Sequence, residues 1–378
     1  MSTYLYLLIL LGYPIVALYE IFCGKQIQIA SHLLGFLFIL LSLLIVGKEF
    51  KKNEFKIDFY QYILAFYSLL YLFKLIISIN YFGWTYLSKP IVYFVAVGFI
   101  PTIAFIVNKK NFIIDGNFLI ALSIMSGAIT FLILAIHYLN INPETHLQSS
   151  HRLGFLFLNP ITIGNISSLA FISNLISVSK KRLSIISFIH FFLMSTALAC
   201  LIFSAAKMAT IGLILTCFFL LIFMNKGSYR KYIFPSAILV FTLIYFNTKF
   251  YTDITELFNH TSRSLLERIV FIKAAFNDFS QNIFLGRAVF DQEYKQYPHN
   301  FFVDILMSTG IIGMFAISIP LARAFIKIYH SIREEFFLLP AIFTIYFFDS
   351  MSSGTFWSNY RLLVTLCLLI SPRVISKI

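Results

Sequence analysis

Long runs of apolar residues dominate the chain, and short polar segments separate them. Two early runs read LYLLILLGYPIVALY and LGFLFILLSLLIVG. About 20 consecutive apolar residues let a helix cross the hydrocarbon core of a bilayer. The runs lack the alternation of apolar and polar residues that β-barrel strands show, and lipid offers the backbone no hydrogen bonds. The pattern therefore predicts an all-α, polytopic integral membrane protein.

The same pattern predicts about twelve membrane-spanning helices. We treat residues 1–378 as a single transmembrane domain, because no internal repeat or low-complexity linker divides them. The first run is long enough to be a span and has no clear small-residue cleavage site, so no cleavable signal peptide is expected. The expected spans are 4–22, 27–46, 58–80, 90–108, 116–139, 161–179, 183–204, 208–224, 232–247, 300–326, 336–350 and 360–372.

The charge distribution predicts the orientation of these spans in the membrane. Charged residues make up only 12% of the chain, about half the share found in soluble domains. The net charge is +13, and the basic residues cluster in alternate loops, as at 48–56, 109–110, 180–182, 226–231, 327–333 and 373–377. Basic loops mark the cytoplasmic side, so both termini are expected in the cytoplasm. Because topology explains the charge, no nucleic-acid partner is expected.

Two connections on the opposite, outer side are too long to be turns. They are a first long periplasmic loop at 140–160 and a large periplasmic loop at 248–299. The larger one contains SRSLLERIVFIKAAFND, in which Ser264 and Glu267 fit a helix-capping box. Leu265, Ile269, Ile272 and Phe276 recur at helical spacing, with Arg263, Arg268 and Lys273 elsewhere. The spacing predicts an amphipathic helix on the outer membrane surface.

Ionisable side chains inside a bilayer are costly and usually functional. Here they gather near the outer leaflet, whereas a proton-driven transporter would place them closer to the midplane. Two alternatives stay open at this stage: Lys74 could extend to the headgroups, and Asp349 could pair with Arg361 as a structural contact. The other members of this layer are Glu20, Lys207, Asp304 and Arg152.

Cations at the outer leaflet suit a lipid-linked diphosphate. Arginine binds phosphate oxygens in bidentate fashion, and fixed cations stabilise the charge that develops on a departing diphosphate. A histidine suits the role of general base toward an attacking sugar hydroxyl. The outer loops contain no metal-type cluster, so no metal and no cofactor are expected.

The stretch QYPHNFFVDILMSTGIIGMF supplies a candidate base. His299 and Asn300 stand at the outer end of a span, just after Pro298, which disfavours helical structure before it. Asp304 follows one turn later, on the same helix face as Asn300. Deeper in the span, two glycines at 310 and 313 would permit close helix approach. A simple polar helix start is the alternative interpretation.

Four segments of the chain resemble the O-antigen ligase/polymerase superfamily of bacterial inner membranes. They are RLGFLFLNPITIGN, SAAKMATIGLIL, ERIVFIKAAFNDFSQNIFLGRA and HNFFVDILMSTGIIG, in the family's order over about 150–315. Lys207 stands where the family usually has an arginine. The resemblance implies His299 as catalytic base, and Arg152, Arg268 and Lys207 as diphosphate-binding cations.

The residues add further candidates to this set. Glu267 and Asp304 join the catalytic candidates, and Asn300 and Arg361 join those that bind the substrate. The resemblance implies a glycosyltransferase that takes its glycan from undecaprenyl diphosphate at the periplasmic face of a Gram-negative inner membrane. The expected partners are that lipid-linked oligosaccharide, the bilayer and a polysaccharide chain-length regulator.

Three functions remain open. The compact second loop and the divergent turn at Lys207 favour an O-antigen polymerase, which adds glycan to another lipid-linked repeat unit. An O-antigen ligase, which adds glycan to lipid A-core, is the first alternative. A polysaccharide flippase or transporter is the second, and it would need a charged central cavity across the membrane.

Overall fold

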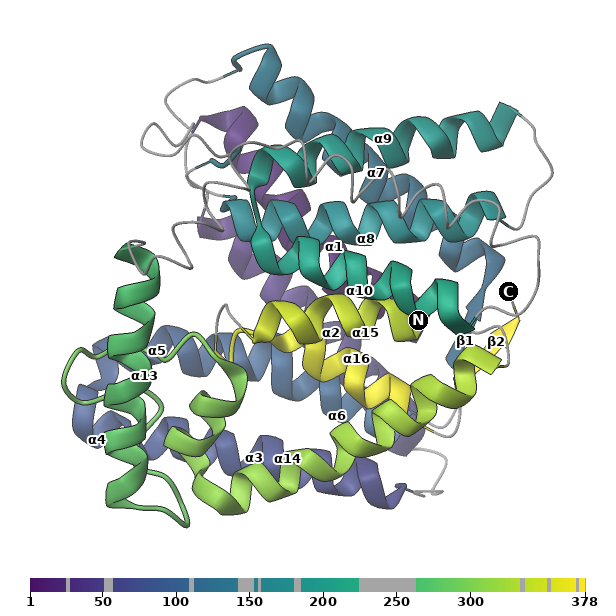
Figure 1. The fold of residues 1–378 in the computed structure, drawn as a ribbon. Coiled ribbons are helices and arrows are strands. Elements are labelled where there is room, and N and C mark those ends of the chain that lie inside the picture. Colours follow the sequence, from purple (N-terminus) through teal and green to yellow (C-terminus); the bar gives the residue numbers. More distant parts are fainter. Residues whose placement is uncertain are drawn as a thin grey trace.

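Helices account for nearly all of the regular structure in a computed structural model of the chain (Figure 1). The structure describes residues 1–24, 28–50, 57–108, 112–141, 153–155, 158–179, 185–223, 263–333, 337–351, 355–371 and 374–377. The elements are α1 (Ser2–Cys23), α2 (Gln28–Phe50), α3 (Phe59–Ile77), α4 (Ile79–Phe82), α5 (Trp84–Tyr93), the π-helix η1 (Phe94–Phe99), α6 (Ile100–Val107), β1 (Phe112–Asp115), α7 (Gly116–Tyr138), α8 (Pro160–Ser179), α9 (Ile185–Ser204), α10 (Lys207–Phe223), α13 (Arg263–Gln281), α14 (Phe301–Arg333), α15 (Leu338–Ser350), α16 (Tyr360–Ile370) and β2 (Val374–Lys377).

The helices confirm a polytopic membrane protein. Within the described ranges, eight helical segments are long and apolar enough to cross a membrane, and three more apolar helices are shorter. Together they coincide with the expected spans except 232–247, which lies outside the described residues. Twelve therefore stays the predicted number.

Both ends of the chain lie at the end of the bundle opposite α13, as Figure 1 shows. The Asn108 side chain, which follows α6, donates a hydrogen bond to the Ser2 hydroxyl at 2.7 Å. Directly after Asn108 in the chain, β1 pairs in parallel with β2 near the C-terminus, with Phe112 opposite Val374. This pairing closes the bundle at that end, and the opposite end is left to the long connections.

The helix α13 lies across the ends of the spanning helices rather than among them (Figure 1). The predicted helix in the large loop is therefore confirmed, and its position on the outer membrane surface stays a prediction. Ala274, Ala275 and Asp278 are buried, whereas Phe276 is 45% exposed. The helix packs against protein on one face and leaves Phe276 outside, where an apolar side chain can meet lipid. The side chain of Ser264, and with it the expected capping box, lies outside what the structure describes.

The helix α14 is broken at Gly310, where φ is 65° and ψ is −161°. A segment of the α13–α14 loop (residues 282–299) fills the break. Arg287 N donates to Met307 O at 2.8 Å, and Ile311 N donates to Ile283 O at 2.9 Å. The loop thus supplies partners for backbone groups that the break removes from the helical pattern, which membrane interiors require.

Two glycines make this close contact possible. A Cβ at Gly286, where φ is also 65°, would lie 2.5 Å from Thr309 N, and a Cβ at Gly310 would collide with the backbone of Phe284. The expected close approach at Gly310 is therefore of a loop and not of a helix. At Gly313 a Cβ would lie 3.2 Å from the Tyr67 ring of α3, which fits the helix approach expected there.

Candidate active site

His299 stands at the last turn of the α13–α14 loop, directly before the cap of α14. Its φ is 52°, a left-handed conformation that is uncommon for residues other than glycine. The imidazole packs on the Tyr297 ring, with centroids 4.3 Å apart, and near the Phe271 ring of α13, at 6.2 Å. Sequence reasoning missed both aromatic neighbours, although Phe271 shares a helix face with Arg268 three residues earlier.

Arg268 of α13 acts electrostatically on this imidazole. Burial and the Arg268 guanidinium lower the pKa of His299 from its ordinary value to about 4. The ring is therefore neutral at physiological pH, which is the form a general base needs. The structure thus brings together two of the predicted residues, Arg268 on α13 and His299 just before α14.

A set of contacts from the α3–α5 region holds the loop that carries His299. The Lys74 ammonium of α3 donates to Gly286 O at 3.0 Å, and Tyr86 of α5 donates to Lys295 O at 2.5 Å. Lys74 is only 8% exposed, so it does not extend to the headgroups. Within the loop, Asp291 accepts from Tyr294 N at 2.6 Å and from Gln296 N at 2.9 Å.

Asn300 begins α14. Its side-chain oxygen accepts hydrogen bonds from Phe302 N and Val303 N, both at 3.1 Å, and its amide nitrogen donates to Met351 O at 3.0 Å. The first two bonds are those of a helix N-cap. The amide is therefore committed to structure, and the polar helix start explains this residue better than the substrate contact we expected.

Asp304 is fully buried, one turn into α14. One carboxylate oxygen accepts from Phe356 N at 2.8 Å and from the Tyr71 hydroxyl at 3.4 Å. The rings of Tyr71 and Phe356 pack together, with centroids 4.7 Å apart. The side chain therefore positions the segment before α16, and its burial argues against the catalytic role we expected.

Glu267 and Lys207 are two further expected residues that the structure describes. Glu267 is exposed on α13. Lys207 begins α10 after a turn in which Ala205 adopts φ 48°, and Leu153 N donates to Phe203 O beside that turn. Arg152 lies outside the described residues, so its expected role stays a prediction.

Arg361 corrects the expected depth map. We placed it at the outer leaflet, but its Nε donates to Ile9 O at 3.4 Å, well inside α1. The reason is that residues 355–359, expected to be an outer loop, turn inward: Phe356 is 2% exposed and packs on Tyr67 and Tyr71 of α3.

Comparison with known proteins identifies the segment that carries His299 and Arg268. Residues 190–318 match the family model described as O-antigen ligase. The match supports the resemblance of this chain to the O-antigen ligase/polymerase superfamily. The matched range contains Lys207, Glu267 and Asp304 as well, and it excludes Arg152 and Arg361. No curated protein matches the chain.

The match agrees with the resemblance found in the sequence. The family covers O-antigen ligase- and polymerase-type enzymes, and the described helices of this chain are those of a multi-pass membrane protein. Among the described residues, no group of three or more His, Cys, Asp or Glu side chains is arranged to hold a metal ion.

Proposed function

We propose that this protein is an O-antigen polymerase. It transfers a growing glycan from undecaprenyl diphosphate to another lipid-linked repeat unit, at the periplasmic face of a Gram-negative inner membrane and without a metal. The observation that carries this proposal is the contact of the His299 imidazole with Phe271 of α13. This helix also carries Arg268 and lies at the end of the bundle opposite both termini (Figure 1).

The chemistry follows from these two groups. An acceptor hydroxyl oxygen attacks the anomeric carbon of the donor glycan, and the bond from that carbon to the diphosphate oxygen breaks. His299 takes the hydroxyl proton as the new glycosidic bond forms. Arg268 faces the negative charge that grows on the leaving diphosphate, with Arg152 and Lys207 as further candidate cations.

The positive charge of Arg268 near His299 also suggests that the donor binds before His299 takes a proton. Without donor, Arg268 keeps the pKa of His299 low. A bound diphosphate would neutralise that charge, so the imidazole would become a stronger base when the donor is in place. The site would thus gain basicity only with substrate bound.

The acceptor distinguishes the proposed polymerase from its alternatives. The compact second loop and Lys207 at the divergent turn favour the polymerase over an O-antigen ligase. A flippase or transporter is the third candidate, and the inward position of Arg361 is the observation that keeps it open.

A deletion strain analysed by lipopolysaccharide gel and lipid extraction separates the three. The polymerase predicts core carrying one repeat unit. Bare core with accumulated lipid-linked polymer would identify a ligase, and bare core with repeat units trapped on the cytoplasmic side would identify a flippase. Either of these last two results overturns the proposal.

A further inference from the structure

Three hydrogen-bond donors just before α16 and in its first turn are buried without an acceptor. They are Trp357 Nε1, Asn359 Nδ2 and Arg361 Nη2, and none has a hydrogen-bond partner among the described residues. Leaving a buried polar group unsatisfied costs about 1–3 kcal/mol, more when it is charged. Three donors within five residues therefore indicate a missing oxygen-rich partner.

Aromatic rings connect two of these donors into one cluster. Trp357 and Tyr360 each meet the Tyr93 ring edge to face, with centroids 5.8 Å and 5.7 Å away. The Arg361 guanidinium lies 5.3 Å from the Tyr360 ring and 5.7 Å from the Tyr346 ring. We call these five residues, together with Asn359 next to Tyr360 in the chain, the Arg361 cluster.

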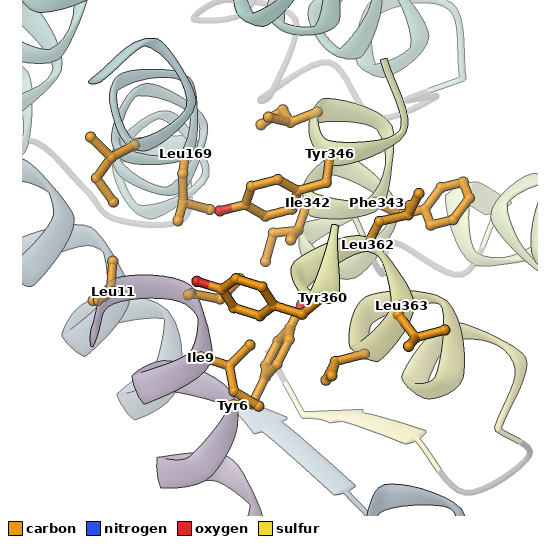
Figure 2. Packing of buried hydrophobic residues seen from close by; sticks show 14 of the residues in the cluster. Tyr6, Ile9, Leu11, Leu169, Ile342, Phe343, Tyr346, Tyr360, Leu362 and Leu363 are labelled. Atoms are coloured by element: carbon orange, nitrogen blue, oxygen red, sulfur yellow. The ribbon is translucent and has the colours of Figure 1, made fainter. Parts of the chain in front are cut away.

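The cluster lies inside the bundle and is not fully packed. Figure 2 shows the Tyr346 and Tyr360 rings projecting from α15 and α16, with their hydroxyl ends toward Leu169 of α8 and Leu11 of α1. Trp357, Arg361 and Tyr93 retain partial exposure, in contrast to the buried Tyr346 and Tyr360. Part of the cluster surface therefore stays open, although the three donor atoms themselves are buried.

The local charge decides between two ligand chemistries. Asp349 of α15, only 8% exposed, acts electrostatically on Arg361 and offsets its positive charge. A diphosphate carries several negative charges and needs a surplus of cations, which this cluster lacks. A sugar is neutral, offers acceptor oxygens to the indole and guanidinium donors, and packs its carbon face on aromatic rings.

We propose that the Arg361 cluster binds a sugar unit of the glycan substrate, at a site distinct from His299 and Arg268. This inference rests on the proposed function for the identity of the glycan, and it replaces the diphosphate contact expected of Arg361. Tyr93 and Trp357 supply the aromatic surface, and Asn359 and Arg361 supply the hydrogen bonds.

The two tryptophans of the chain give a direct assay. Trp84 is 59% exposed at the start of α5, so Trp84→Phe leaves Trp357 as the single fluorophore, inside the cluster. The probe is the oligosaccharide released by mild acid from the host's lipid-linked repeat unit, added to purified full-length protein in detergent. We expect a saturable change in Trp357 emission, and a Kd raised at least about tenfold by a further Asn359→Ala or Arg361→Lys substitution, which is about 1.4 kcal/mol.

Matched controls make the outcomes distinct. The Trp357→Phe protein, which keeps only Trp84, should show no change. A response to inorganic pyrophosphate and not to the oligosaccharide would overturn the sugar assignment, as would a response that the Asn359 and Arg361 variants leave intact. No response in a protein that transfers glycan refutes the sugar site and leaves the proposed function standing. Binding without transfer supports the site and refutes the proposed function.

Discussion

Two non-helical segments of this protein carry polar groups at the level of the spanning helices, and they treat those groups differently. Backbone groups of the α13–α14 loop form hydrogen bonds with the side chains of Lys74, Ser78 and Tyr86. Asp278 of α13 forms an ion pair with Arg287 of the loop at 2.8 Å. Gln292 Nε2 is the one buried side-chain atom in the described loop without a partner. Just before α16 and in its first turn, three donors lack partners among the described residues.

The difference indicates that the α13–α14 loop is a structural platform for His299, whereas the Arg361 cluster is a binding surface. A polar network whose members are satisfied rigidifies its segment, which suits a loop that must hold His299 in a strained conformation. Donors left without acceptors destabilise the empty protein and are retained where a ligand completes them. Mutations in the platform should therefore lower stability and transfer rate, whereas mutations in the Arg361 cluster should weaken ligand binding.

The break in α14 should be the most sensitive part of the platform. Gly310→Ala forces a Cβ into the Phe284 backbone at a left-handed residue, a cost on the order of 3 kcal/mol. We expect little folded protein, measured by size-exclusion chromatography and thermal unfolding in detergent. Gly47→Ala in α2 is the control, because a Cβ at that position would meet no other atom within 4 Å. Equal yields of the two variants would contradict the close contact between loop and helix.

His299→Ala should abolish transfer while the protein still inserts and folds. Loss of a general base costs roughly 10²–10⁴-fold in rate. O-antigen ladders on lipopolysaccharide gels measure the effect, with His330→Ala, an exposed residue near the other end of α14, as the matched control. Ladders of normal length from the His299 variant would remove the base assignment.

Arg268 should affect both the rate and its pH dependence. His299 is active when neutral, so activity falls as pH drops through its pKa of about 4. Arg268→Gln removes the nearby charge, which raises that pKa toward its ordinary value and moves the acidic limb of kcat/KM to higher pH. We expect a rate loss of about 10–100-fold for Gln and less for Lys, which keeps the charge. An unmoved acidic limb in the Gln variant would show that the two groups do not interact.

Lys74→Met tests how far the platform positions the base. The substitution leaves the buried Gly286 carbonyl without its donor, at a cost of about 1–3 kcal/mol. We expect about a tenfold lower kcat with KM nearly unchanged, and partial rescue by Lys74→Arg. Lys89→Met, an exposed position on α5, should have no effect. A change confined to KM would instead indicate contact with substrate.

Asp304→Asn should have the smallest effect. The amide oxygen can still accept from Phe356 N, so a change under about threefold is expected, within the range of conservative substitutions. Asp304→Ala should lower thermal stability, because Phe356 N would lose its acceptor. Loss of transfer in a stable Asn variant would restore the catalytic role.

Much of the fold could be predicted because lipid imposes a strong rule on composition. Apolar runs predicted all the spans that the structure describes, and the helix at 263–281 emerged from its spacing. The resemblance to a known family also singled out His299 and Arg268. Sequence reasoning failed where a residue's role depends on neighbours far along the chain, as with Asn300, whose amide donates to Met351 O.

The sequence by itself therefore determined the membrane-spanning class, the helix order and the resemblance to a family, because each depends on local hydropathy or short motifs. The tertiary structure alone decided how deep each polar side chain lies in the bundle and which groups it bonds. It moved Arg361 into the bundle, committed Asn300 and Asp304 to structural hydrogen bonds, and joined Gly286 to the break at Gly310. These outcomes depend on where non-helical segments fold back, and no periodicity in the chain encodes that path.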